Sequence, residues 1–366
     1  MTLRHPFVFS AGLMSTAGLV LAACAPSAPG AQEDVEGTTT LVVAPSSEMS
    51  AAWAQFAVAQ EQGFFADNGI SVELQWPGGS SDVLQQMATG RVQIGAPTPE
   101  AVLAAEAKGQ DVEMIYNWTR APVQWLAVDK GSAITSFKDL EGKKVGVANL
   151  ASGAKLLCEA AVRDAGGDPS KIDFVATGTG VAANDALKQG RVDALMLWDT
   201  EYTKMEQAGS QLQYLKSEAY GDLFSTTFAA QAEWVRSNPE LVKGFGKAWA
   251  EATVWATENP EAAVEMMWKR YPQTKISDDP KLLDKHVELF EGRNVSAMTG
   301  DPIESKTLGQ YPPKSIDTWL DFARQAKITS SPLKADALYT NDFVEAYNDF
   351  DEQAVKKSAS EYTSDE

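Results

Sequence analysis

The sequence predicts an α/β protein of two doubly wound lobes, because two stretches of the chain run through the same order of elements. The apolar strand segments fall at residues 41–44, 70–74 and 93–96 in the first stretch and at 144–147, 172–175 and 193–197 in the second. A helical segment lies between each strand and the next, which is the alternation that builds a parallel sheet with helices packed on it. Both second helices end at Gly-Arg-Val, at Gly90 and Gly190. Two such lobes form a cleft, and ligands bind at the carboxyl ends of the strands.

The connections between the lobes predict a hinge with two crossings. Residues 123–128 have the pattern of a strand that passes toward the second lobe, and residues 226–230 that of a strand that returns to the first. Beyond them, residues 232–271, 280–291 and 315–326 show helical spacing of apolar and aromatic side chains. We expect these helices to pack on the first lobe as structural elements. The alternative is that they offer an amphipathic face to a partner.

A chain of 366 residues has enough material for two hydrophobic cores. The expected organisation is a signal peptide at 1–23, a flexible tether at 24–40, a first lobe from 41–125 and 226–349, a second lobe at 126–225, and an acidic tail at 350–366. The tail is rich in Ser and is expected to fray.

The N-terminus predicts export and lipid anchoring. Arg4 and His5 precede an apolar stretch over residues 7–21, which leads through Leu-Ala-Ala to Cys24. The stretch is too short for a permanent membrane span and ends in small residues, as a signal peptide does. A Cys directly after Leu-Ala-Ala resembles the lipoprotein signal of bacteria, in which the Cys24 thiol receives a lipid and becomes the new N-terminus. The alternative is an ordinary signal peptide that happens to contain a Cys.

Acyl chains on Cys24 would hold the folded part at the outer face of the cell membrane, in an extracellular or periplasmic location. Residues 25–40 are rich in Ala, Pro, Gly, Ser and acidic side chains without an apolar period, as a flexible tether is. The formal net charge of −19 argues against nucleic acid as a partner. We expect a monomer in which Cys158, the other Cys, is a small core residue rather than a nucleophile.

In doubly wound lobes, the functional side chains should lie in loops that directly follow strands. These loops are residues 46–50, 78–81, 97–100, 149–155, 177–180 and 198–202. The loop at 149–155 has the strongest physical rationale, because a strand there leads into a helix start whose free N–H groups and dipole attract anions. Ser152 could donate its hydroxyl to a ligand or cap that helix. Gly79 and Ser80 mark the equivalent start in the first lobe, without the Lys-Ser or Lys-Thr of a nucleotide P-loop.

Aromatic and charged side chains follow other strands. Trp198 ends a strand and could form a flat wall against a planar or aliphatic ligand. Asp199 and Glu100 could accept hydrogen bonds from a cationic or N–H group; alternatively, Asp199 caps the next helix and Glu100 is a solvated acid in a first helical turn. Trp118 and Arg120 leave another strand, and Arg120 could pair with a ligand carboxylate or sulfonate or form a structural salt bridge.

Arrangements typical of enzymes are missing from the sequence. It has no Gly-X-Ser-X-Gly elbow and no metal-spaced Cys or His. Its two His are His5, in the predicted signal, and His286, which we expect at the surface. We therefore predict a protein that is not an enzyme and uses no cofactor and no metal.

Several of these segments resemble the solute-binding proteins of bacterial ABC importers, and more narrowly the group that serves sulfonates, taurine, nitrate and the pyrimidine precursor of thiamine. The matching text is Gln-Gly-Phe-Phe-Ala-Asp-Asn-Gly at 62–69, Gly-Gly-Ser-Ser at 78–81, Met-Ala-Thr-Gly-Arg-Val at 87–92, Lys-Asp-Leu-Glu-Gly-Lys-Lys at 138–144 and Gln-Gly-Arg-Val-Asp-Ala at 189–194. The resemblance covers roughly residues 38–330. It is specific for the family and weak for the ligand.

The resemblance implies two Rossmann-like lobes of the type II periplasmic binding protein fold, with the extra C-terminal helices on the first lobe. Such a protein closes on a small organic solute, here of the sulfonate, taurine or thiamine-pyrimidine class, and delivers it to an ABC permease with its cytosolic ATPase. Carried over by position, the family's pocket falls on Ser47, Gly79, Ser80, Thr98, Ser152, Gly153 and Trp198. The loops after the strands add Glu100, Trp118, Thr179 and Asp199 as candidate ligand-binding residues.

One departure from the family bears on the ligand. Sulfonate binders often have small hydroxyl residues after the third strand, where this chain has Pro-Thr-Pro followed by Glu100. An acid there disfavours a bare anion such as nitrate and favours a ligand with N–H or ammonium groups. Some eukaryotic relatives make the thiamine pyrimidine themselves, consuming an active-site His and using a Cys-rich iron-binding motif, and neither feature is present here. The alternatives are a lipid-anchored ligand sensor, which fits the residues equally well, and a pyrimidine-related enzyme on the same fold.

Overall fold

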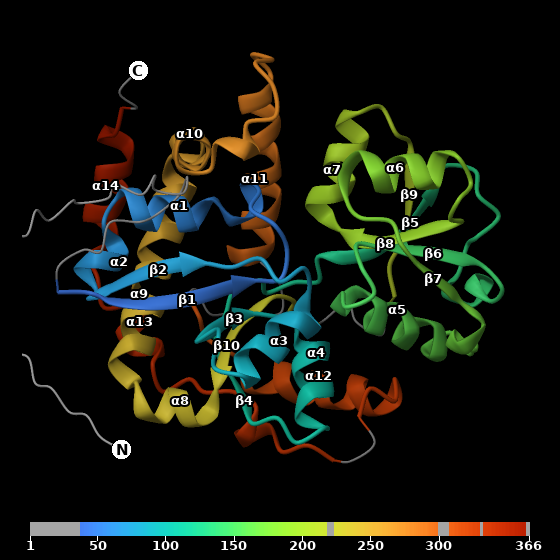
Figure 1. Ribbon diagram of the computed structural model, residues 1–366, viewed down its shortest axis with the longest axis horizontal. Coiled ribbons are helices and arrows are strands. Elements are labelled where there is room, and N and C mark those ends of the chain that lie inside the picture. The colour runs from blue at the N-terminus through green and yellow to red at the C-terminus, as the bar shows by residue number, and fades with distance from the viewer. Residues whose placement is uncertain (1–36, 218–222, 299–306, 330–331, 364–366) are drawn as a thin grey trace, which may run out of the picture. The chain divides into compact units, whose positions relative to one another are not determined.

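The computed structural model describes residues 37–217, 223–298, 307–329 and 332–363, all of which belong to one compact unit. The predicted signal peptide, Cys24 and the predicted tether up to residue 36 lie outside the described residues. Two five-stranded sheets carry the helices of this unit (Figure 1). Among the described helices, none combines the length and the apolar character needed to cross a bilayer.

The two sheets share one strand order. The first contains β1 (Thr39–Pro45), β2 (Ile70–Leu74), β3 (Ile94–Ala96), β4 (Val112–Asn117) and β10 (Thr227–Gln231), in the order β2-β1-β3-β10-β4. The second contains β5 (Gln124–Asp129), β6 (Lys144–Val147), β7 (Asp173–Ala176), β8 (Ala194–Trp198) and β9 (Leu212–Leu215), in the order β7-β6-β8-β5-β9. In each sheet the first three strands are parallel, and an antiparallel strand separates the third from the edge. The predicted duplication of an α/β lobe is confirmed.

The two crossings between the lobes lie side by side as a hydrogen-bonded pair. The backbone N–H of Thr119 donates to Thr226 at 3.0 Å, and that of Ser225 donates to Thr119 at 2.8 Å. The predicted hinge with two crossings is thus present. The first crossing ends before β5, so the lobe boundary predicted after residue 125 is two residues late and falls inside that strand.

Most helices belong to the first lobe: η1 (Ala51–Trp53), α1 (Ala54–Glu61), α2 (Phe64–Asp67), α3 (Ser80–Ala88), α4 (Pro99–Glu106), α8 (Ala232–Ser237), α9 (Pro239–Glu258), α10 (Pro260–Arg270), η5 (Pro272–Thr274), α11 (Leu282–Met298), α12 (Pro313–Gln325), η6 (Ala335–Ala337), α13 (Val344–Tyr347) and α14 (Glu352–Glu361). The second lobe carries η2 (Phe137–Leu140), α5 (Gly153–Asp164), η3 (Pro169–Lys171), α6 (Gly180–Lys188) and α7 (Asp199–Gln207). In Figure 1, α9 lies against the first sheet, where it contacts β2, while α5 and α6 lie on opposite faces of the second sheet.

An aromatic cluster forms the centre of the first lobe. The ring of Trp249, on α9, lies 4.6 Å from that of Phe56 on α1 and 4.8 Å from that of Phe228 on β10, between ring centroids. Its side chain is fully buried. The expectation that the C-terminal aromatic helices pack on the first lobe is confirmed for α9. This rigid core supports the loops that follow β1 and β3.

Replacing Trp249 with Ala should lower the free energy of unfolding by about 3–5 kcal/mol, because a fully buried aromatic side chain leaves a cavity. Denaturant unfolding followed by circular dichroism measures this loss. Val181→Ala, at an exposed position of α6, is the control and should change the free energy by less than about 0.5 kcal/mol. A loss under about 1 kcal/mol for Trp249→Ala would show that this cluster is not the main core.

One expectation about the C-terminal part is wrong. Residues 350–366 do not form a frayed tail throughout, because α14 buries Val355 and Ala359 against α9, and the Asn259 side chain donates to the Ala359 carbonyl at 2.9 Å. The sequence signal for α14 is the spacing of these two apolar residues within an otherwise acidic segment. Cys158, by contrast, is fully buried on α5, which confirms its place in the core.

Candidate ligand-binding site

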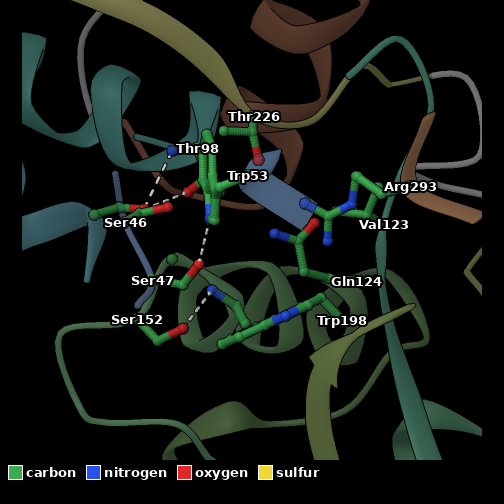
Figure 2. A pocket seen from close by; sticks show the side chains of 13 residues that line it. Ser46, Ser47, Trp53, Thr98, Val123, Gln124, Ser152, Trp198, Thr226 and Arg293 are labelled. Atoms are coloured by element: carbon green, nitrogen blue, oxygen red, sulfur yellow. Dashed lines mark hydrogen bonds between the residues drawn. The ribbon is translucent and has the colours of Figure 1, made fainter. Parts of the chain in front are cut away.

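A pocket lies at the carboxyl ends of strands from both sheets (Figure 2). Its free volume is about 30 Å³, and it is partly open to solvent. Its lining consists of Ser46, Ser47, Trp53, Ser80, Thr98, Val123, Gln124, Ser152, Gly153, Ala154, Trp198, Thr226 and Arg293. The structure thus brings together, on one pocket, the predicted residues Ser47, Ser80, Thr98, Ser152, Gly153 and Trp198. That they bind a ligand stays a prediction.

Hydroxyl groups at two helix starts form the first-lobe wall. Ser80 begins α3 and Thr98 is the N-cap residue of α4. The Ser80 Oγ accepts a hydrogen bond from the Thr98 backbone N–H at 3.1 Å and lies 3.1 Å from the Thr98 Oγ1. Beside them, the Ser47 Oγ accepts from the Trp53 Nε1 at 2.9 Å, as Figure 2 shows.

The start of α5 forms the second-lobe wall. Ser152 is its N-cap residue, and the Oγ accepts from the Ala154 N–H at 3.3 Å. A serine that accepts in this way keeps its hydroxyl proton for another partner. Both predicted roles of Ser152 are therefore compatible, since the residue caps α5 and also lines the pocket.

Gly153 allows the lobes to approach closely. A Cβ atom at this position would overlap the Thr98 Oγ1 and would lie 2.5 Å from the Glu100 Oε1, which no real Cβ tolerates. Further along the cleft, the Ser81 N–H donates to the Ala151 carbonyl at 3.3 Å, and the Asn149 side chain donates to the Gly78 carbonyl. The two lobes are in contact, so the cleft is closed.

Gly79 and Thr179 lie next to the pocket rather than on its lining. A Cβ on Gly79 would lie 3.0 Å from the Ala151 carbonyl oxygen, so this glycine serves the contact between the lobes. Thr179 precedes α6 and borders an adjoining cavity of about 220 Å³, which shares Ser47, Ser152 and Trp198 with the pocket. The pocket therefore continues toward α6 and α7.

An ion pair crosses between the lobes at the pocket. Arg293 of α11 donates from Nη2 and Nε to the two carboxylate oxygens of Asp199, at 2.5 and 3.2 Å. The Arg293 side chain is 5% exposed and the Asp199 side chain 17%. Asp199 also accepts from the Thr200 N–H at 2.7 Å. The charge of the guanidinium in the pocket is thus balanced within the protein.

Glu100 is buried beneath the pocket. Its exposed fraction is 1%, so the expectation of a solvated first-turn acid is wrong. It borders a small cavity of about 10 Å³ that it shares with Gln124, Ser225 and Trp319. Burial raises the pKa of Glu100 to about 7, although a hydrogen bond with the Thr98 side chain acts in the opposite direction. The Oε1 atom has no hydrogen-bond partner among the described residues.

The two candidates that follow β4, Trp118 and Arg120, are both buried in the first lobe. Trp118 is 2% exposed and packs in the first-lobe core, with its ring centroid 4.2 Å from that of Trp53. It reaches the site only indirectly, because the Arg293 guanidinium lies 5.8 Å from its ring centroid. Arg120 is also buried, and it donates to the Thr307 carbonyl at 2.5 Å. It therefore contacts the backbone at Thr307.

His286 is not a surface residue, contrary to expectation. It is 9% exposed, and its Nδ1 accepts from the Trp268 Nε1 at 3.0 Å. Burial, followed by the charge of Lys204, lowers the pKa of His286 to about 4, which keeps the ring neutral near pH 7. Among the described residues, no group of three or more His, Cys, Asp or Glu side chains is placed to hold a metal ion.

Five residues of the lining lie outside the loops predicted to carry function: Trp53, Val123, Gln124, Thr226 and Arg293. Gln124 belongs to the segment predicted to cross toward the second lobe, where it accepts from the Ser225 hydroxyl at 2.8 Å. Arg293 comes from the C-terminal helices, which were assigned a purely structural role. The available signal in the sequence was a basic residue near the apolar end of a helix. The structure explains its position, because α11 crosses α7 and brings Arg293 to Asp199.

A comparison with protein-family models identifies the family of this chain. The family model described as NMT1/THI5 like matches residues 50–263. The chain belongs to the NMT1/THI5-like family. The resemblance found in the sequence is therefore confirmed at the level of the family.

Relatives of this NMT1/THI5-like protein carry two kinds of name. A 4-amino-5-hydroxymethyl-2-methylpyrimidine phosphate synthase of Legionella pneumophila is 29% identical over 238 residues, which are 64% of this chain and 74% of that protein. A formylaminopyrimidine-binding protein of Halalkalibacterium halodurans is 24% identical over 214 residues, which are 57% of this chain and 64% of the relative. The second alignment thus covers less than two thirds of the relative. The names leave synthesis and binding both open.

Solved structures confirm the fold of this family member. A protein of Bordetella bronchiseptica superposes with a TM-score of 0.69 at 20% identity, covering 85% of this chain and 98% of that chain. The periplasmic aliphatic sulphonate binding protein of Escherichia coli gives 0.60 at 16% identity, covering 83% and 99%. The predicted two-lobed periplasmic-binding-protein fold is therefore present.

Proposed function

We propose that this protein is the extracytoplasmic substrate-binding lipoprotein of an ABC importer. It captures a small organic solute by closing its two lobes and delivers the solute to the permease and its ATPase. Lipid on Cys24 anchors it at the outer face of the cell membrane. The observation that carries this proposal is the pocket itself, whose hydroxyl and aromatic groups come from both lobes and therefore act together only when the cleft is closed.

The chemistry of the described lining favours a planar, uncharged heterocycle of the thiamine-pyrimidine class over a sulfonate. Arg293 is the cationic side chain in the lining, and Asp199 balances its charge. The remaining polar groups are hydroxyls and the Gln124 amide, which can both donate and accept. The Trp53 and Trp198 rings offer flat apolar surfaces of the kind that heterocycles bind. The name of the Halalkalibacterium relative supports the same class.

Calorimetry with formylaminopyrimidine, 4-amino-5-hydroxymethyl-2-methylpyrimidine, taurine and an alkanesulfonate tests the ligand class. We expect one of the two pyrimidines to bind with a Kd of micromolar or below, which is about −8 kcal/mol or more favourable. A ligand at 100 times its Kd should also stabilise the protein by about 2.7 kcal/mol. Tight binding of taurine or the alkanesulfonate without either pyrimidine would contradict the proposed class.

Trp198→Ala should raise the Kd for the bound pyrimidine at least 100-fold, because it removes the aromatic surface at the end of β8. The fold should survive, since the side chain is only partly buried. Trp125→Ala is the matched control, because Trp125 lies on the neighbouring strand with the Lys216 ammonium 4.2 Å from its ring centroid, and it does not line the pocket. An unchanged Kd for Trp198→Ala would mean that the pocket is misassigned.

The synthase names among the relatives favour a second candidate, a pyrimidine-forming enzyme. The resemblance ties that activity to a consumed active-site His, whereas His286 is hydrogen-bonded to Trp268 outside the pocket lining. Mass spectrometry of the incubated protein separates the two functions. A released pyrimidine phosphate, with a matching loss of mass at a His, would favour the enzyme.

A further inference from the structure

The buried carboxyl of Glu100 stands at the end of a chain of hydroxyl groups that leads into the pocket. The Glu100 Oε1 and the Thr98 Oγ1 lie side by side, because a single Cβ placed on Gly153 would come within 2.5 Å of the first and would overlap the second. The Thr98 Oγ1 in turn lies 3.1 Å from the Ser80 Oγ, and either of these hydroxyls can be the donor. Ser80 and Thr98 line the pocket, while Glu100 lies behind them.

Which hydroxyl donates and which accepts in this series of hydrogen bonds depends on whether the Glu100 carboxyl carries a proton. As a neutral acid, Glu100 donates to the Thr98 Oγ1, and the Thr98 hydroxyl then donates to Ser80. The Ser80 Oγ already accepts from the Thr98 backbone N–H, so both its lone pairs are used and its own proton points to the ligand. As a carboxylate, Glu100 accepts from Thr98, Thr98 accepts from Ser80, and Ser80 has only an acceptor left for the ligand.

The closed cleft favours the neutral acid. Gly153, from the second lobe, lies so close that a Cβ there would be 2.5 Å from the Glu100 Oε1. The other walls of the small cavity beside Glu100 are neutral, with Gln124 and Ser225 from the hinge side and Trp319 from α12. The charged groups of the neighbouring pocket, Arg293 and Asp199, are paired with each other. No described group supplies the positive charge that a buried carboxylate needs.

We propose that Glu100 determines the specificity of the pocket: closure of the lobes holds it as a neutral acid, and its proton orients the Thr98 and Ser80 hydroxyls so that Ser80 donates a hydrogen bond to an acceptor on the ligand. The ligand class is then one that presents a ring nitrogen or a carbonyl oxygen at Ser80. This inference rests on the proposed function and revises the expectation that Glu100 favours a ligand N–H.

Ligand capture should therefore be coupled to the uptake of one proton. Glu100 has an ordinary pKa near 4.5 when solvated and a pKa of about 7 in the closed form, so closure is favoured below pH 7. This advantage is lost as the pH rises toward 7. The Kd for the bound pyrimidine should rise with pH between about 5 and 7, by at most about tenfold per pH unit.

Three variants test the coupling by calorimetry from pH 5 to 8 with the pyrimidine. Glu100→Gln, whose amide is neutral at every pH, should bind with a nearly constant Kd. Glu106→Gln is the matched control on the same helix, because Glu106 is partly buried but accepts from the Val112 N–H away from the pocket, and it should follow the wild type. Ser80→Ala should raise the Kd about tenfold at pH 5. A flat wild-type profile, or an equal slope in Glu100→Gln, would overturn the proposal.

A second measurement needs no ligand. Ser81→Cys and Ala151→Cys, oxidised to a disulfide, would lock the lobes closed where their backbones already meet at 3.3 Å. At pH 6 the locked protein should show the infrared carbonyl band of a protonated acid, which Glu100→Gln removes and Glu106→Gln retains. A band that Glu100→Gln leaves unchanged would overturn the inference whatever ligand binds. If no pyrimidine binds but this band behaves as expected, the proposed ligand class fails and the role of Glu100 stands.

Discussion

Replacing Gly153 with Ala should hold the two lobes apart while leaving each of them folded. The new Cβ would overlap the Thr98 Oγ1 and come within 2.5 Å of the Glu100 Oε1, and both atoms belong to buried residues with little room to move. Since both side chains are on the opposite lobe, opening the cleft relieves the overlap. The closed form, in which both walls contact a ligand, should therefore be lost.

The expected result for Gly153→Ala is at least a 100-fold rise in Kd with an unchanged melting temperature of the ligand-free protein. Small-angle X-ray scattering should show a ligand-bound wild type that is more compact than the variant. Gly292→Ala on α11 is the matched control, because a Cβ there meets no heavy atom within 4 Å. Its binding should equal that of the wild type. Wild-type affinity in Gly153→Ala would show that closure does not bring α5 against Thr98.

Asp199→Asn should be the next most damaging change to closure. It leaves the Arg293 guanidinium, which is 5% exposed in the closed form, without its anionic partner. Breaking a buried ion pair from one side costs about 3–5 kcal/mol, and the 17% exposure of Asp199 places the expected cost at the lower end. Because opening returns the guanidinium to water, the cost should appear as weaker binding, by about 100-fold in Kd.

A double-mutant cycle isolates this effect. Adding Arg293→Gln to Asp199→Asn removes the unpaired charge, so the double variant should bind more tightly than Asp199→Asn alone. Lys243→Gln breaks the exposed pair with Glu240 and should change neither stability nor Kd measurably. Additive effects of the two cleft substitutions would mean that the pair does not couple the lobes.

The fold could be predicted largely from the sequence, because its signals are local. Apolar strands, the helices between them and glycines at the helix ends repeat in both halves, and they predict the two α/β lobes that the structure has. The loops after strands β1, β3, β6 and β8 were located correctly for the same reason. The helix α14 within residues 350–366 was not predicted, because the acidic composition of the segment indicated a frayed tail. Its two apolar residues, Val355 and Ala359, are buried against α9.

The chemistry of the site depended on contacts between distant segments, which a single sequence does not reveal. Asp199 was expected to cap a helix or bind a ligand, and its partner Arg293 lies 94 residues away along the chain. Glu100 has the sequence context of an exposed helix start. In the structure, Gly153 approaches it from the other lobe, and Gln124 and Trp319 wall the cavity beside it, so Glu100 is buried.

The position of β10 determines which of the two sheets can form first during synthesis of the chain. The second sheet is built from an uninterrupted stretch of chain, residues 124–215, and can assemble as soon as that stretch has emerged. The first sheet needs β10 between β3 and β4, although residues 112–117 are made more than a hundred positions earlier. The first sheet therefore stays incomplete, with the facing edges of β3 and β4 unpaired, until β10 has been synthesised.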